Sequence, residues 1–157
     1  IKKDELFCAK NGEIISDKLH GQMPSSAIIR IENPDAESLD LNLFSRNYVI
    51  ARGFAISYEK YTKRLRIDRS DLTNQLNVKY GTDRQIILEN GLTSMDIFVD
   101  HSTVEIFVNE GEYVLSARIF PTKEEHMIRM GGKNLNLSIW STEPSVDDAP
   151  VFFAENQ

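Results

Sequence analysis

The chain has 157 residues, of which 41% are hydrophobic, and this length suits a single domain with a sizeable core. Its formal net charge of −6 argues against nucleic acids and anionic membrane surfaces as partners, because both attract basic proteins. No apolar run is long enough to span a bilayer, and the single cysteine, Cys8, excludes an internal disulfide and fits a reducing compartment.

The N-terminal part of the chain alternates short apolar segments with turn signals. It begins IKKDELF, without an initiator methionine or a secretory signal, so we expect a piece of a longer protein. Asn11-Gly12 lies between two apolar segments and predicts a β-hairpin there. Further short strands are expected at Ala27–Glu32, Leu39–Leu43 and Tyr48–Ala51.

The middle of the chain predicts a second hairpin and another strand. In the hairpin over Phe54–Asp68, Leu65 should lie opposite Tyr58 and Ile67 opposite Ile56. Residues 71–79 read as a loop with one helical turn. The remaining strands outside the central meander are expected at 84–89, 127–130 and 135–140.

Met95–Phe120 is the most regular part of the sequence and predicts three strands joined by two turns, DHST and NEGE. One face of these strands is aliphatic and should belong to the core. The cross-strand pairs expected on it are Met95–Val108, Ile97–Ile106, Val99–Val104, Val108–Tyr113, Ile106–Leu115 and Val104–Ala117.

The opposite face of the meander is mixed. It holds two aromatic residues, Phe98 and Phe107, which we interpret as an interface for another domain. Arg118 lies diagonally next to Glu105, so we expect an ion-pair ladder of Asp100, Glu105 and Arg118 that orders this face.

No segment has sustained helical periodicity, and about ten short strands separated by turns favour an all-β fold. We predict a two-sheet antiparallel β-sandwich, jelly-roll-like and similar to concanavalin A. The predicted domain covers residues 1–142, and the segment 143–157, rich in Pro, Asp and Ser, is expected to form a C-terminal tail.

Candidates for catalysis are weak. Asp96, Asp100 and Glu105 share a face, and a retaining glycosidase needs two carboxyl groups about 5 Å apart. Acid–base work also needs an enclosed site that shifts pKa values, and nothing near these residues indicates one. A solvated or interfacial strand face is therefore favoured, and no catalytic residue is assigned. The three histidines, His20, His101 and His126, lack metal-ligand spacing, and no metal or cofactor is expected.

Exposed aromatic residues leave a carbohydrate-binding role open. A sugar-stacking platform could use several aromatic side chains, although domain packing is the favoured role for those of the mixed face. The candidates are Tyr48, Phe54, Tyr58, Tyr61, Phe98, Phe107, Tyr113 and Trp140.

Two stretches resemble a known family. DIFVDHSTVEIFVNEGEYVLSARIFP at 96–121 is similar to the signature hairpin of the C-terminal β-sandwich of glycoside hydrolase family 32, the family of invertases and sucrose-6-phosphate hydrolases. Upstream, ISYEKYTKRLRIDRS at 56–70 is also family-like, with Asp68, Arg69 and Ser70 intact and Glu59 in place of the usual Asp. The resemblance covers about Phe54–Trp140.

The resemblance implies a parent enzyme that hydrolyses a β-fructofuranosyl bond in sucrose, its 6-phosphate or fructans, with retention and without metal or cofactor. In that family the catalytic motifs, W-M-N-D-P-N-G, R-D-P and Glu-Cys, belong to a five-bladed β-propeller, and none is present here; Cys8 follows Phe7 and not a glutamate. The chain would then be a non-catalytic domain that stabilises the N-terminal catalytic propeller, with a homodimer possible in some relatives. We expect a bacterial, cytoplasmic enzyme; an autonomous carbohydrate-binding module is the alternative.

Overall fold

The computed structural model describes residues 5–9, 26–46, 52–75 and 81–142. These described residues form eleven β-strands and no helix. The strands are β1 (Glu5–Ala9), β2 (Ser26–Glu32), β3 (Leu39–Ser45), β4 (Phe54–Glu59), β5 (Arg64–Asp68), β6 (Asp83–Ile87), β7 (Ser94–Asp100), β8 (Thr103–Val108), β9 (Tyr113–Arg118), β10 (Met127–Gly132) and β11 (Asn136–Ser141).

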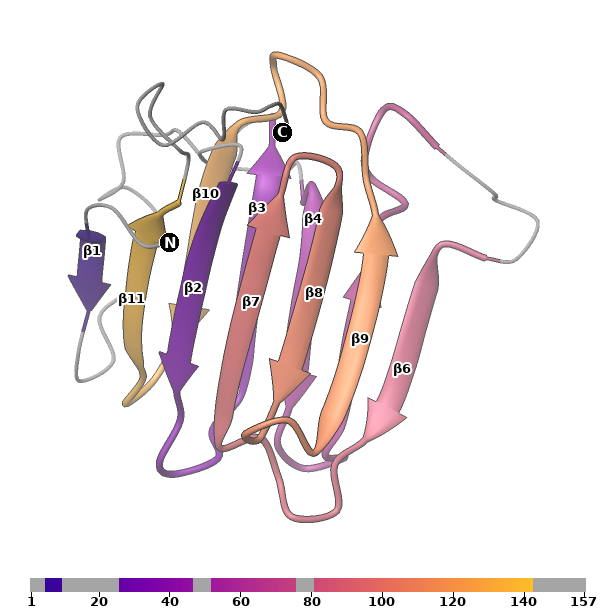
Figure 1. Cartoon of the computed structure of the whole chain (residues 1–157). Coiled ribbons are helices and arrows are strands. Elements are labelled where there is room, and N and C mark those ends of the chain that lie inside the picture. Colours follow the sequence, from indigo (N-terminus) through magenta and orange to yellow (C-terminus); the bar gives the residue numbers. More distant parts are fainter. Residues whose placement is uncertain (1–4, 10–25, 47–51, 76–80, 143–157) are drawn as a thin grey trace.

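The strands form two antiparallel sheets that face each other (Figure 1). The six-stranded sheet has the order β1-β11-β2-β7-β8-β9, and the five-stranded sheet has the order β10-β3-β4-β5-β6. The chain therefore crosses between the layers several times, and strands distant in sequence become neighbours, as β2 and β7 do. This arrangement confirms the predicted two-sheet antiparallel β-sandwich.

The predicted register of the central meander is confirmed. β7 pairs with β8 so that Val99 lies opposite Val104, and β8 pairs with β9 so that Ile106 lies opposite Leu115. The hairpin of β4 and β5 also has the predicted register, with Tyr58 opposite Leu65. In each case the alternation of apolar and polar residues excludes a shift of one residue, because such a shift would turn the apolar side chains outward.

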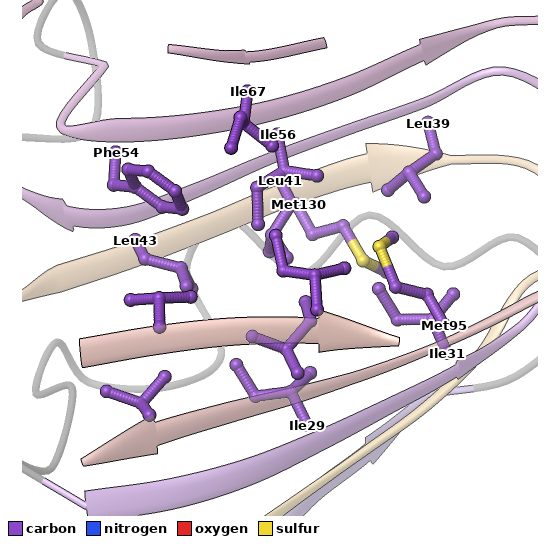
Figure 2. Close-up of a cluster of buried hydrophobic side chains, with 14 of the residues drawn as sticks. Ile29, Ile31, Leu39, Leu41, Leu43, Phe54, Ile56, Ile67, Met95 and Met130 are labelled. Atoms are coloured by element: carbon purple, nitrogen blue, oxygen red, sulfur yellow. The ribbon is translucent and has the colours of Figure 1, made fainter. Parts of the chain in front are cut away.

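The core lies between the two sheets. Aliphatic side chains from both layers meet there, with Ile29, Ile31 and Met95 on one side (Figure 2). From the five-stranded sheet Leu41 and Ile56 point toward them, and all five are fully buried. Closely packed aliphatic side chains of this kind provide most of the free energy that holds such a sandwich together.

The remaining sequence predictions concern the N-terminal strand, segments outside the described residues, and the loop after β5. β1 is present but pairs with β11, the last strand. The predicted hairpin at Asn11-Gly12, the strand at 48–51 and the tail at 143–157 lie outside the described residues. Residues 71–75 form turns and bends, and the helical turn predicted in this region is not present in the described part of it. None of the described residues belongs to a helix that could span a membrane.

Candidate functional site

The outer face of the six-stranded sheet carries the residues that the sequence singled out. Strand pairing places Trp140 opposite Ile28, and Ile28 opposite Phe98. Phe107 lies diagonally next to Phe98, and Val114 lies opposite Phe107. These five residues form a continuous apolar band across five strands, which we call the outer-face stripe. With strands about 4.8 Å apart, the stripe is roughly 19 Å long.

The outer-face stripe is open to solvent at its centre and at one end. Phe98 is 41% exposed and Val114 is 54% exposed, whereas the other three side chains are half-buried. The rings of Phe98 and Phe107 pack edge to face, with centroids 5.5 Å apart and an interplanar angle of 88°. This geometry is favourable for aromatic pairs and keeps both rings in place on the surface. The stripe is thus an ordered apolar surface.

The predicted ladder of Asp100, Glu105 and Arg118 does not form. Among the described residues, the ion pairs within 4.0 Å include none between Glu105 and Arg118. The Arg118 guanidinium lies instead over the ring of Phe120, 5.5 Å from its centroid, and both Glu105 and Arg118 are exposed. The diagonal spacing was correct, but two solvated side chains gain little from pairing at a surface.

A different ion-pair network orders this face. The Arg30 guanidinium of β2 donates to Asp96 at 2.7 Å and to Glu110 at 2.9 Å, with Glu32 at 3.5 Å. A hydrogen bond from Arg30 lowers the pKa of Glu110, and a second one from the Ser94 hydroxyl adds to this effect. The network joins β2, β7 and the turn after β8, and it lies beside the stripe because Asp96 is opposite Phe107.

The three carboxylates that could have formed a catalytic pair occupy separate environments. Asp96 is bound by Arg30, as described above. Asp100 accepts a hydrogen bond from the Ser26 hydroxyl at 3.2 Å, and its side chain is 74% exposed. Asp96 and Asp100 thus each bind a different residue of β2, and Glu105 is exposed and has no ion-pair partner among the described residues. In the described part of the chain, no three His, Cys, Asp or Glu side chains converge in a way that could hold a metal ion.

The NEGE turn between β8 and β9 has a structural function that explains its residues. Asn109 has a positive φ of 53°, and its side-chain oxygen accepts hydrogen bonds from the backbone N–H groups of Thr93 and Ser94. Its amide nitrogen donates to the Gly91 carbonyl at 2.8 Å. Asparagine tolerates this left-handed conformation better than most residues, and Gly111 (φ 90°) tolerates it without steric cost. The turn therefore ties the β6–β7 loop to the meander.

The DRS segment, residues 68–70 at the end of β5, forms polar contacts that stabilise the five-stranded sheet. Asp68 is buried and accepts a hydrogen bond from the Ser70 N–H at 2.8 Å, with the guanidinium groups of Arg52 at 3.3 Å and Arg66 at 3.2 Å. Burial alone would raise its pKa, but the hydrogen bonds from Ser70 and the two positive charges outweigh burial and lower the pKa. Asp71 then binds the backbone N–H groups at Arg52 and Gly53.

Glu125, between β9 and β10, is a buried carboxylate that the sequence did not single out. Its oxygens accept hydrogen bonds from the N–H and hydroxyl of Thr73, at 2.8 and 3.1 Å, and from the Thr122 N–H at 2.9 Å. Arg46 lies 3.4 Å away. Glu125 and Arg30 were missed for the same reason: most of their partners come from segments distant in sequence, and no local pattern shows such pairings.

The comparison with protein families gives one clear match. Residues 9–141 match the family described as "Glycosyl hydrolases family 32 C terminal". This range includes the meander, the DRS segment and all the strands of both sheets except part of β1.

Individual relatives agree with the family match. Sucrose-6-phosphate hydrolases are similar to this chain: that of Streptococcus mutans is 35% identical over 60% of this chain and 19% of its own length, and that of Bacillus subtilis is 29% identical over 84% and 27%. The solved sucrose-6-phosphate hydrolase of Lactobacillus gasseri is 25% identical, with a TM-score of 0.72 over 90% of this chain and 28% of that one. An exo-inulinase from Aspergillus awamori shares the fold, with 18% identity and a TM-score of 0.61 over 91% of this chain and 28% of that one.

The chain therefore spans less than a third of the length of these relatives, and most of each relative lies outside the matched region. The fold, the family match and the similarity to bacterial sucrose-6-phosphate hydrolases all agree. The chain belongs to glycosyl hydrolase family 32 and corresponds to the C-terminal β-sandwich domain of its enzymes.

Proposed function

We propose that the chain is the non-catalytic C-terminal domain of a retaining β-fructofuranosidase and stabilises that enzyme's catalytic β-propeller by docking on it. The observation that carries this proposal is the outer-face stripe, an ordered apolar band on a domain that accounts for only 28% of a solved relative. The rest of such an enzyme is large enough to cover the band.

Covering the outer-face stripe would stabilise the complete enzyme. Burying apolar surface gives about 25 cal/mol per Å², so the exposed parts of Phe98, Phe107 and Val114 together would contribute about 2–4 kcal/mol. The polar residues beside the stripe, Asp100, Glu105 and Arg118, would form the rim of the interface. Exposed Glu105 and Arg118 have no ion-pair partner among the described residues and are free to pair with groups of the propeller.

The proposed activity belongs to the complete enzyme. Relatives named sucrose-6-phosphate hydrolase support hydrolysis of sucrose or sucrose 6-phosphate. The separate partners of the carboxylates on the six-stranded sheet support a non-catalytic role for this domain. A cytoplasmic location in a bacterium is part of the proposal, because a phosphorylated sugar is charged and does not cross membranes unaided.

The test compares one double variant with one single control variant in the complete enzyme. Phe98→Ser with Phe107→Ser removes the centre of the stripe, and Ile87→Ser, a 48% exposed residue of β6 on the other layer, is the matched control. We expect the double variant to lower the melting temperature of the complete enzyme by several degrees and to raise hydrogen exchange in β7 and β8. The same substitutions in the 157-residue chain alone should change stability little, because both rings are already partly solvated.

Other outcomes would decide against the proposal. If the double variant and Ile87→Ser behave alike in the complete enzyme, the stripe does not dock on the propeller. If the chain alone sediments as a dimer and the double variant makes it monomeric, a second copy occupies the stripe. If the chain alone hydrolyses sucrose 6-phosphate, the domain is itself catalytic.

A further inference from the structure

A groove lies on the outer face of the five-stranded sheet, the layer opposite to the outer-face stripe. Its volume is about 780 Å³, and it runs from β10 across β3 and β4 to the β4–β5 turn. Among the residues that line the groove are Asp40, Ser57, Tyr61, Arg64, Arg66 and Lys133.

The floor of the groove is a single row of residues across four strands. Strand pairing places Gly131 opposite Asp40, Asp40 opposite Ser57, and Ser57 opposite Arg66. Two of these four residues have little or no side chain, and a Cβ at Gly131 would meet nothing within 4 Å, so this end of the floor is open. The side chains of this row, Asp40, Ser57 and Arg66, offer hydrogen-bonding groups to a ligand in the groove.

Tyr61 stands at the edge of the groove and is 82% exposed, the most exposed large hydrophobic side chain in the described part of the chain. Its turn is nevertheless well held. The Glu59 carboxylate accepts hydrogen bonds from the N–H groups of Tyr61 at 3.2 Å and Thr62 at 2.8 Å. Lys60 donates from its backbone to Ser38 at 3.0 Å and from its ammonium group to Glu37 at 3.1 Å. The backbone that presents the ring is therefore already ordered, and binding has to order only the side chain.

The polar groups around this ring are available to a ligand. Asp40, Arg64 and Lys133 are exposed and have no hydrogen bond or ion pair to any described residue. Glu37, by contrast, is bound by Lys60, and Arg66 is bound by Asp68 and Asp83. One free carboxylate acceptor and two free cationic donors therefore line the same groove as the Tyr61 ring, which has the Lys60 ammonium 5.2 Å from its centroid.

We infer that this groove binds a neutral oligosaccharide, with Tyr61 stacking on the apolar face of one sugar ring and Asp40, Ser57 and Arg64 bonding its hydroxyl groups. A sugar presents donors and acceptors together with a C–H face, which matches a mixed acid, hydroxyl, cation and aromatic set. The groove holds both carboxylates and cations, a mixture that suits a neutral ligand with donors and acceptors, and the phosphate titration below tests the anion alternative. The inference goes beyond docking on the propeller, and it concerns the opposite layer, so either proposal can fail without the other.

The test is a titration of the 157-residue chain, followed by amide NMR shifts, with the neutral trisaccharide kestose, with maltotriose and with inorganic phosphate. We expect saturable shifts for at least one sugar, confined to the groove floor and the Tyr61 turn. Tyr61→Ala should weaken that binding about five- to tenfold, the size expected for loss of an aromatic contact. Phe120→Ala, an exposed aromatic residue on the other side of the sandwich, is the matched control and should leave the affinity unchanged.

The other outcomes overturn the inference. No saturable shift with either sugar at tens of millimolar would exclude a sugar site, as would shifts that map away from the groove. Equal binding by Tyr61→Ala and the unmodified chain would show that the ring is not a platform. Saturation by phosphate that tightens in Asp40→Asn would identify an anion site instead. None of these results would affect docking by the outer-face stripe, which is tested in the complete enzyme.

Discussion

The two outer faces of the sandwich use their polar and apolar residues in opposite ways. On the five-stranded sheet, one row of polar residues is bound within the domain: Asp68 is buried between Arg52 and Arg66, and Arg129 donates twice to the Asn42 side chain. The charged groups that remain in solvent on this side include Asp40, Arg64 and Lys133, which line the groove. On the six-stranded sheet, the middle of the face is an apolar stripe with Phe98 41% exposed. Its charged groups, apart from the Arg30 network, remain in solvent.

This difference distinguishes the face of the five-stranded sheet, whose buried polar groups bind one another, from the face of the six-stranded sheet, whose apolar groups need a partner to cover them. Buried polar groups are tolerated only when their hydrogen bonds are made, and the five-stranded side satisfies nearly all of them internally. Within the described residues the exception is the Asn42 amide nitrogen, which is buried without a partner. Exposed apolar groups, by contrast, gain free energy only when something covers them. The stability of the isolated chain should therefore depend more on the polar contacts of the five-stranded sheet than on the outer-face stripe of the six-stranded sheet.

The largest expected effect is at Glu125, which ties together the loops at the end of the five-stranded sheet. Glu125→Ala leaves the N–H groups of Thr73 and Thr122 without acceptors, and we expect a loss of about 3 kcal/mol in the free energy of unfolding. Urea denaturation of the chain measures this loss. Glu124→Ala, at the exposed neighbouring position, should change it by less than about 0.5 kcal/mol. Equal effects at the two positions would mean that the buried carboxylate does not hold these loops.

A smaller but pH-dependent effect is expected at Asp68. Asp68→Ala should lower the free energy of unfolding by about 2 kcal/mol at neutral pH, because the Ser70 N–H and two guanidinium groups lose their acceptor. The folded-state pKa of Asp68 lies below its ordinary value of 3.8, so its contribution is present above that pH and is lost as pH falls through the folded-state value. The difference between variant and unmodified chain should therefore shrink below about pH 4. A difference that stays constant down to pH 2 would contradict this linkage.

The Arg30 network should matter less, because it lies at the surface of the other face. Arg30→Gln removes ion pairs to Asp96 and Glu110, and we expect a loss of about 1 kcal/mol at low ionic strength. In about 1 M salt the loss should become small, because exposed charges are screened within about 3 Å. Denaturation at the two salt concentrations measures the difference. A loss that is the same in both would show that packing of the arginine stem, not its charge, supports the face.

The sequence predicted the local geometry of this domain well and its long-range polar contacts poorly. Alternating aliphatic residues predicted the register of β7, β8 and β9, because each apolar side chain must face the core. The same alternation placed Phe98 and Phe107 on the outer face. It could not show that β2 pairs with β7, so Arg30, the partner of Asp96, was missed. Glu125 was missed because its donors come from three separate loops.

The smallest effect in the isolated chain is expected at Arg118. For this residue the loss of stability should differ most between the isolated chain and the complete enzyme. Its guanidinium contacts only the Phe120 ring among the described residues, and it is exposed, so Arg118→Ala in the chain alone should change the free energy of unfolding by less than about 0.5 kcal/mol. In the complete enzyme the loss should be larger, with turnover unchanged, because docking would desolvate Arg118 and bring it to a partner at the rim of the stripe. Melting temperature and turnover of the complete enzyme measure both effects. Lost turnover with unchanged stability would place Arg118 in the catalytic machinery, and an equally small effect in both contexts would leave this end of the face outside the interface.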